Sequence, residues 1–122
     1  GMSNIDEVKS ALNILINSGT KKNKITVLHA NTEYPTPMKD VNLRSMLTIG
    51  KELDINFGYS DHTLGISAAI KSYFLGAKML EKHYTFDQAS QRNCELAHLC
   101  SFTPETLRTF TNLVKNFKIM EK

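Results

Sequence analysis

Apolar residues along the chain recur in two patterns that together predict alternating helices and strands. Residues spaced three or four apart predict helices at 4–18, 41–53, 64–75 and 104–117. Short continuous apolar runs predict strands at 25–30, 55–59 and 77–81. The order α-β-α-β-α-β-α requires crossover connections, which make neighbouring strands pair in parallel with right-handed connections.

Residues that start or stop regular structure divide these elements. Asp40, Thr63 and Thr103 are expected to cap the second, third and last helices, and a proline follows Thr103 at the first helical position. Pro35 and Pro37 allow neither helix nor strand to continue, so they predict a fixed loop after the first strand. Residues 86–102 are polar and show no regular pattern.

Three parallel strands are too few for a closed barrel, and both edges of such a sheet stay unpaired. The pattern therefore indicates part of a larger assembly. With 122 residues we expect one domain over residues 1–122, with about 70% of the chain's surface buried. Gly1 before Met2 is typical of a cleaved expression tag.

Composition narrows the choice of partners. Hydrophobic residues at 41% and charged residues at 22% are ordinary for a soluble domain. The net charge of +3 is spread along the chain, and its only basic cluster, 21–24, lies in a predicted loop, so we expect no nucleic acid partner. No apolar run approaches the ~20 residues of a membrane span, and no signal peptide is visible, so we expect a cytoplasmic protein without a membrane partner.

Cysteine usage does not indicate a metal site. Cys94 and Cys100 should be reduced thiols in a cytoplasmic chain. His98 between them gives C-x3-H-x-C, which matches no usual zinc spacing. Ordinary packing or loop positions are the preferred interpretation of these residues.

The polar clusters 58–63 and 81–85 follow the second and third strands, at the edge where α/β proteins build active sites. Glu81 and His83 are two residues apart and so share a face. His62 follows the neighbouring strand, about 4.8 Å away. These three side chains can converge on a divalent cation such as Mn²⁺, Fe²⁺ or Zn²⁺. The alternative is that each histidine is an ordinary loop or core residue.

Three neighbours of His62 have two interpretations each. Asp61 can orient His62 by a hydrogen bond or cap the following helix. Ser60 and Thr63, at a predicted helix start, can hold a phosphate or carboxylate, or can serve in capping alone.

Four segments carry a resemblance to a known family. They are Asn31-Thr-Glu-Tyr-Pro-Thr-Pro37, Asp40-Val-Asn-Leu-Arg44, Gly58-Tyr-Ser-Asp-His-Thr-Leu-Gly65 and Glu81-Lys-His-Tyr-Thr85. In this order and spacing they resemble the signature blocks of the N-acetylneuraminate (sialic acid) synthase family, which includes legionaminate and pseudaminate synthases. The match covers about residues 25–87 strongly and the remainder loosely.

The resemblance implies a fold and a reaction. Family members have a (β/α)8 (TIM) barrel followed by an antifreeze-like domain. They condense phosphoenolpyruvate with an N-acetylated hexosamine aldehyde and release phosphate, using Mn²⁺ or Mg²⁺. The metal would polarise the aldehyde for attack by the enol carbon. This chain would be a partial TIM barrel, the second half only, without the antifreeze-like domain.

The resemblance also implies roles for individual residues. His62 and His83 match the metal-binding histidines, and Glu81 matches the acidic catalytic residue beside the metal. Two further matches are Thr32 and Ser60 near phosphoenolpyruvate. Tyr34 matches a tyrosine that contacts the sugar.

Two departures from the family pattern matter. The lysines that bind phosphoenolpyruvate lie on strands outside this chain. A sugar-binding aspartate that follows the eighth strand is replaced here by Ala97.

Three hypotheses follow. The chain is a synthase fragment that comes from a longer parent or is completed by a homo-oligomer or a complementary half-barrel chain, although two identical copies supply no phosphoenolpyruvate lysine. Alternatively it is a non-catalytic half-barrel that binds metal or a protein partner. An unrelated α/β binding module would require the four segments to match by coincidence.

Overall fold

The computed structural model describes residues 1–86 and 96–122, and only the backbone of Leu96 and Ala97. Its α-helices are α1 (Ile5–Asn17), α2 (Arg44–Leu53), α3 (Ser67–Phe74), α4 (Leu96–Leu99) and α5 (Pro104–Met120). Its strands are β1 (Thr26–Ala30), β2 (Asn56–Asp61) and β3 (Leu80–Lys82). Short 3-10 helices, η1 (Lys22–Lys24) and η2 (Met38–Asp40), lie before β1 and α2.

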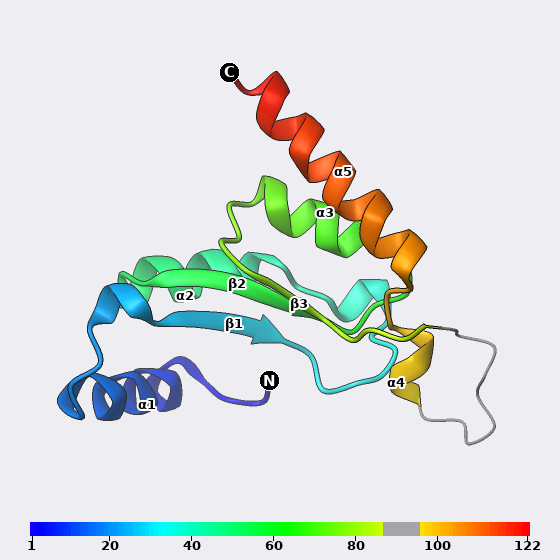
Figure 1. The fold of residues 1–122 in the computed structure, drawn as a ribbon. Helices are drawn as coiled ribbons and strands as arrows, with labels where there is room; N and C mark the ends of the chain where they lie inside the picture. The colour runs from blue at the N-terminus through cyan, green and yellow to red at the C-terminus, as the bar shows by residue number, and fades with distance from the viewer. Residues whose placement is uncertain (87–95) are drawn as a thin grey trace.

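The strands form one parallel sheet in the order β1-β2-β3, as the crossover pattern predicts. Ser60 is level with Ala30 on one side and with Glu81 on the other. The carboxyl ends of the strands therefore meet at one edge, the end of the molecule where α4 lies (Figure 1). Three parallel strands in sequence order, joined by helical crossovers, are the arrangement that the sequence predicts for a partial TIM barrel.

Two apolar clusters join the helices to one face of the sheet. The first lies between β2 and the helices α2 and α3, and its buried members are Val41, Met46, Tyr59 and Ala68. The second joins α1 and α2 near the start of β1, and its buried members are Leu12, Ile25 and Leu53. Because side chains alternate along a strand, Tyr59 and Asp61 lie on this helix-covered face, and Ser60 and His62 lie on the other.

Two predicted caps are wrong. Asp40 lies in η2, and α2 begins only at Arg44 without a side-chain cap. Thr63 does not cap α3, which begins at Ser67. The backbone N–H and the hydroxyl of Thr63 both donate to Asp61 Oδ1 at 2.8 Å, so the chain makes a tight corner here before it can start a helix.

Several boundaries also differ from the sequence prediction. β2 runs two residues further than expected, to Asp61, and β3 starts later, at Leu80. The irregular segment 86–102 contains α4 and ends in a parallel bridge between Tyr84 and Phe102. No residue of α5 is fully buried, because among the described elements this helix packs beside α3 without reaching the sheet core.

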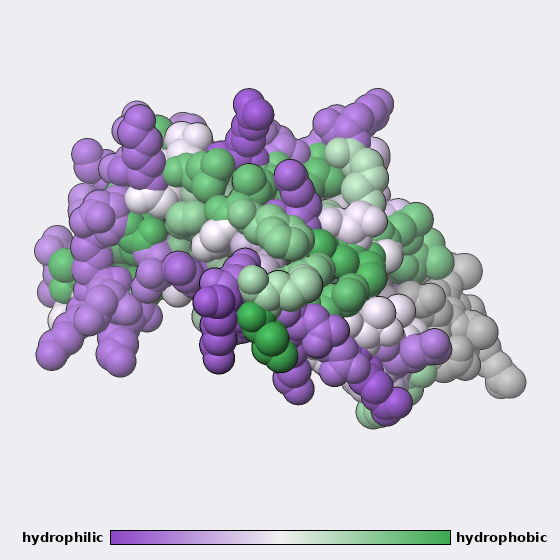
Figure 2. Space-filling view, turned by 90° about the horizontal axis from the view of Figure 1, so that it is seen from above, coloured by the Kyte–Doolittle hydropathy of each residue, from purple (hydrophilic) through white to green (hydrophobic). Residues whose placement is uncertain are grey.

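The surface carries more apolar area than the sequence pattern suggests. Phe74 and Met79 are 57% and 51% exposed. Figure 2 shows apolar side chains running as a band between hydrophilic groups. Extended apolar surface is typical of regions that contact a partner. Within the described residues, no helix has the length and apolar character of a membrane span.

Candidate active site at the carboxyl ends of the strands

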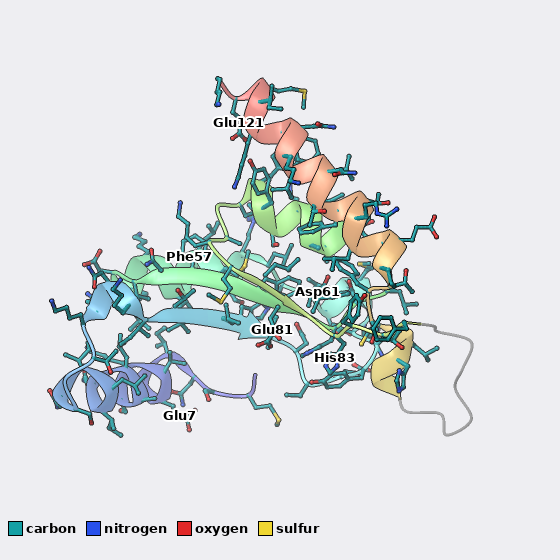
Figure 3. All side chains as sticks on the ribbon, in the orientation of Figure 1. Glu7, Phe57, Asp61, Glu81, His83 and Glu121 are labelled. Atoms are coloured by element: carbon teal, nitrogen blue, oxygen red, sulfur yellow. The ribbon has the colours of Figure 1, made fainter. Side chains whose placement is uncertain are left out.

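A cavity of about 200 Å³ lies at the carboxyl ends of β2 and β3. Its lining residues are Ser60, His62, Glu81, Lys82 and His83. Figure 3 shows Glu81 and His83 on one side of the strand layer and Asp61 on the other. The structure therefore brings together four of the residues singled out from the sequence, on the face of the sheet away from the helices.

His62 is held in one orientation by a backbone group. Its Nδ1 lies 2.6 Å from the carbonyl oxygen of Asn31. Because a carbonyl only accepts hydrogen bonds, Nδ1 must carry the proton, and in the neutral ring Nε2 keeps its lone pair. His62 Nε2 lies 3.5 Å from the Ser60 hydroxyl. This is the arrangement in which metal-binding histidines are usually found.

Tyr34 connects the two histidines. Its ring centroid is 4.1 Å from that of His62 and 5.5 Å from that of His83, and the two imidazoles are 5.4 Å apart. The loop that carries Tyr34 contains a cis Tyr34–Pro35 peptide bond. The N–H of Thr36 donates to the His62 carbonyl at 2.8 Å, which fixes the loop against the end of β2.

Ser60 and Glu81 form a short link across the two strands. The Ser60 hydroxyl donates to Glu81 Oε1 at 2.6 Å. Hydrogen bonds to an ionised carboxylate are shorter and stronger than neutral ones, so this pair holds both side chains in place. Thr32, by contrast, is an exposed residue of the loop after β1.

Asp61 does not orient His62, contrary to one of the two sequence interpretations. Its carboxylate lies on the helix side of the sheet, where Oδ2 is 3.0 Å from Lys82 Nζ. The Lys82 ammonium also donates to the carbonyl of Thr63 at 2.6 Å. The reason is the alternation of side chains, which places Asp61 and His62 on opposite faces.

Tyr59 lies fully buried on the same side, and its hydroxyl has no hydrogen-bond partner among the described residues. Burial, and then the neighbouring Asp61 carboxylate, raise the pKa of Tyr59 above its ordinary value. A pKa raised by folding contributes stability that is complete below the unfolded-state pKa of about 10 and is lost as the pH rises further.

We therefore expect the Tyr59→Phe variant to lose less stability than the unmodified chain when the pH is raised. The free energy of unfolding of the unmodified chain should fall more steeply than that of the variant between about pH 8 and pH 11. Urea unfolding of both proteins at both pH values measures this difference. Parallel losses in the two proteins would contradict the prediction.

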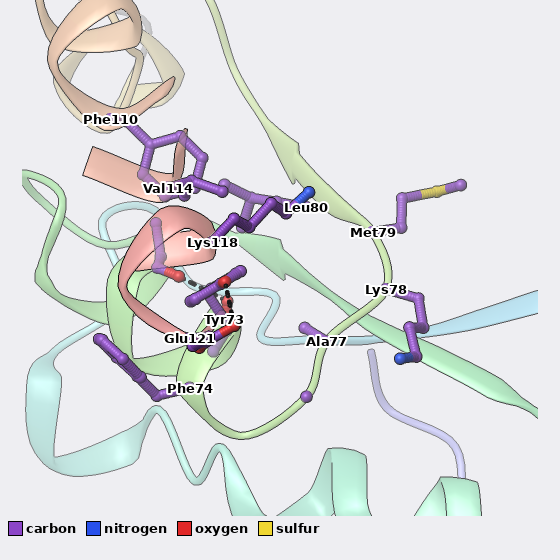
Figure 4. Close-up of a pocket in the computed structure, with 13 residues that line it drawn as sticks. Tyr73, Phe74, Ala77, Lys78, Met79, Leu80, Phe110, Val114, Lys118 and Glu121 are labelled. Carbon is purple, nitrogen blue, oxygen red and sulfur yellow. Dashed lines mark hydrogen bonds between the residues drawn. The ribbon is translucent and has the colours of Figure 1, made fainter. Parts of the chain in front are cut away.

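Two other features are separate from this site. A cavity of about 590 Å³ lies between α3, α5 and the segment that leads into β3, and Tyr73 and Glu121 form a 3.2 Å hydrogen bond on its wall (Figure 4). It contains none of the residues singled out for chemistry. Burial raises the pKa of the Cys100 thiol, which disfavours the thiolate that a metal requires. Cys94 and the Ala97 side chain lie outside the described residues.

The donor atoms at the cavity fit a divalent metal in part. Two imidazoles and one carboxylate are a donor set that suits Mn²⁺, and His62 already presents the correct nitrogen. In the described part of the chain, however, no three histidine, cysteine, aspartate or glutamate side chains are already gathered as a ligand group. The residues are thus compatible with a two-histidine site whose other ligands come from elsewhere.

Comparison with known proteins identifies the family. The model of the NeuB family matches residues 1–122. The chain belongs to the NeuB family. This confirms the resemblance to sialic acid synthases inferred from the four sequence segments.

Sequence matches to individual proteins support the same family assignment. The chain is 41% identical over 109 residues to N,N'-diacetyllegionaminic acid synthase of Campylobacter jejuni, a match that covers 83% of this chain and 33% of that protein. It is 31% identical over 120 residues to N-acetylneuraminate-9-phosphate synthase of Drosophila melanogaster, covering 98% of this chain and 31% of that protein. The chain thus spans about a third of the length of the curated relatives it matches.

A solved NeuB-type structure has the same fold. The N-acetylneuraminic acid synthetase of Leptospira borgpetersenii, solved with citrate, superposes with a TM-score of 0.87 at 27% identity. The match covers 100% of this chain and 41% of that protein.

Sequence reasoning missed two contributors to the site. The Asn31 carbonyl that orients His62 is a backbone group, and no sequence signal could have indicated it. Lys82 could have been found, because Asp61 and Lys82 occupy the positions between the site residues on adjacent strands and carry opposite charges.

Proposed function

We propose that this chain carries the metal-binding part of a nonulosonic acid synthase active site. The parent reaction joins phosphoenolpyruvate to an N-acetylated hexosamine aldehyde, consumes one water, gives a sialic-type acid and releases phosphate. The observation that carries the proposal is the pairing of His62 with His83 at 5.4 Å, with the Nδ1 atom of His62 already bonded to a carbonyl. Membership of the NeuB family supports the same reaction class.

In this proposal each site residue has a role that its position supports. His62 Nε2 and the His83 ring would hold Mn²⁺ or Mg²⁺, which supplies Lewis-acid polarisation of the sugar aldehyde. Tyr34 lies against both imidazoles, so a sugar that reaches them also meets this ring. Glu81 Oε1 accepts the hydrogen bond of the Ser60 hydroxyl, which leaves Oε2 to accept a proton from the water that the reaction consumes, while the aldehyde oxygen gains a proton.

Phosphoenolpyruvate would bind between this chain and the barrel strands that lie outside it. Ser60 and Thr32 lie at and beyond the carboxyl ends of β2 and β1, and their hydroxyls suit a phosphate or carboxylate group. The family's lysines for this substrate would come from the first strands of the barrel. The described residues leave one edge of β1 without a pairing strand, so the further strands can be added there, as part of a longer chain, a complementary half-barrel or another copy.

A chimera tests the proposal. Residues 1–122 would replace the matched segment of the Campylobacter jejuni synthase, and phosphate release would be measured with phosphoenolpyruvate, an N-acetylated hexosamine and Mn²⁺. We expect activity that His62→Ala abolishes and that His29→Gln retains, because Gln can still donate to the Val41 carbonyl that His29 Nε2 contacts at 2.8 Å.

A folded chimera that binds Mn²⁺ but releases no phosphate would reject the synthase proposal. That result would favour the second candidate, a non-catalytic half-barrel that binds metal or a protein partner. Thermal unfolding of the chimera shows whether a negative result comes from loss of the fold.

A further inference from the structure

We infer that the buried ion pair of Asp61 and Lys82 positions the two metal-site histidines relative to each other. The inference rests on the metal site proposed above. Asp61 is the last residue of β2 and stands between Ser60 and His62 in the sequence, and Lys82 is the last residue of β3 and stands between Glu81 and His83. The charged groups of the pair therefore join the two strands on the face of the sheet opposite to the Ser60 and Glu81 side chains.

The ion pair specifies one register of β2 against β3. Asp61 and Lys82 are level with each other in the sheet, and their charged atoms lie 3.0 Å apart. The side chains are 0% and 5% exposed. A slip of one residue would turn the Lys82 side chain to the face that carries Ser60 and Glu81 and leave the Asp61 carboxylate buried without its partner, so the pair opposes any other alignment.

The same pair fixes the corner that carries His62. Asp61 Oδ1 accepts two hydrogen bonds from Thr63, and Lys82 Nζ donates to the Thr63 carbonyl. Both neighbours of His62 in the chain are thus held from the buried side. The position of the His62 ring then depends only on its side-chain torsion angles, and the hydrogen bond to the Asn31 carbonyl fixes these.

His83 is fixed through an adjacent contact. The Lys82 ammonium lies 5.1 Å from the centre of the Phe102 ring, close enough for a cation–π interaction. The backbone N–H of Phe102 donates to the His83 carbonyl at 2.7 Å. Lys82 therefore contacts Thr63, which follows His62, and Phe102, which is hydrogen-bonded to the backbone of His83.

Stability alone does not account for this pair. A buried ion pair often contributes no more stability than an uncharged pair of similar size, and its best-attested role is to specify alignment. We therefore separate positioning from stability with the double variant Asp61→Asn/Lys82→Met. The introduced asparagine can still accept hydrogen bonds from Thr63, and the introduced methionine fills the space of the lysine stem, so no buried charge is left unpaired.

The experiment uses two readouts on the full chain. The first is the NMR spectrum of the histidine ring nitrogens, recorded without metal, which reports which ring nitrogen carries the proton. We expect separate Nδ1–H and Nε2 signals for His62 in the unmodified chain and averaged signals in the double variant. The second is Mn²⁺ affinity by calorimetry, which we expect to fall about 10–100-fold in a variant that remains folded.

Two controls accompany the double variant. Lys82→Arg keeps the positive charge beside Asp61 and should retain the ordered His62 signals and most of the affinity. Lys22→Met/Asp54→Asn removes the other ion pair of the described residues, 3.2 Å long and 43% and 97% exposed, and should change neither readout. If the double variant does not fold, Asp61→Glu provides the comparison, because it keeps both charges but displaces the carboxylate by one methylene.

The outcomes distinguish this inference from the proposed function. Ordered His62 signals and unchanged Mn²⁺ affinity in a folded double variant would overturn the positioning role and leave the metal site standing. Absence of Mn²⁺ binding by the unmodified chain would remove the metal site, and the NMR comparison would still decide whether the pair orders His62.

Discussion

Replacing Lys82 alone by methionine should lower the free energy of unfolding by about 3–5 kcal/mol, the largest effect expected of any single substitution here. The variant leaves the Asp61 carboxylate, which is fully buried, without its cation. It also leaves the carbonyl of Thr63, another fully buried residue, without its donor. Chemical denaturation at neutral pH, followed by circular dichroism, measures the change.

The matched control is Lys22→Met. Lys22 contacts Asp54 at 3.2 Å, a distance similar to that of the buried pair, but both side chains are substantially exposed. Exposed pairs contribute at most about 1 kcal/mol, so this variant should remain close to the unmodified chain. Equal losses in the two variants would show that the Lys82 contact is not a desolvated ion pair.

Gly58→Ala should destabilise the chain by about 3 kcal/mol, at the upper end of the cost of overpacking. A Cβ atom at this position would lie 2.3 Å from the Met79 carbonyl oxygen and 2.6 Å from Leu28 Cδ2. The carbonyl belongs to the backbone and accepts the N–H of Tyr59 at 3.0 Å, so it cannot move without opening the pairing of β2 and β3. We expect the Tyr59 amide to lose protection from hydrogen exchange.

Gly65→Ala separates this steric effect from backbone strain. Gly65 has a φ of +71°, and a Cβ there would meet no atom within 4 Å. Alanine should cost about 1–2 kcal/mol for the left-handed conformation, and the Tyr59 amide should stay protected. If both variants leave that amide equally protected, the contact between Gly58 and the Met79 carbonyl does not limit the spacing of the strands.

The order of the elements could be predicted because the burial of apolar side chains leaves a regular repeat along the whole of a helix or strand. The apolar spacing of α1, α2, α3 and α5 and the three apolar runs gave the correct order and the parallel pairing. Helix starts were harder, because a residue such as Thr63 suits a cap and also suits a side-chain hydrogen bond with Asp61. Only the three-dimensional position of Asp61 decides between these two uses.

The site could be predicted where it depends on strand alternation. Two-residue spacing and adjacent strands were enough to expect Glu81, His83 and His62 at one cavity, and the structure places them there. The position of the Tyr34 ring between the imidazoles could not be foreseen, because it depends on the path of an irregular loop. The roles of these residues in binding metal and substrates remain predictions.

A Mn²⁺ titration of the chain by calorimetry, beside His62→Ala and His29→Gln, tests directly whether His62 and His83 form a metal site. His29 serves as the control because its ring stacks on Tyr59, at 5.9 Å, on the helix side of the sheet. We expect about one Mn²⁺ per chain, lost in His62→Ala and retained in His29→Gln. No binding by the unmodified chain, or equal binding by His62→Ala, would contradict a metal site assembled by His62 and His83.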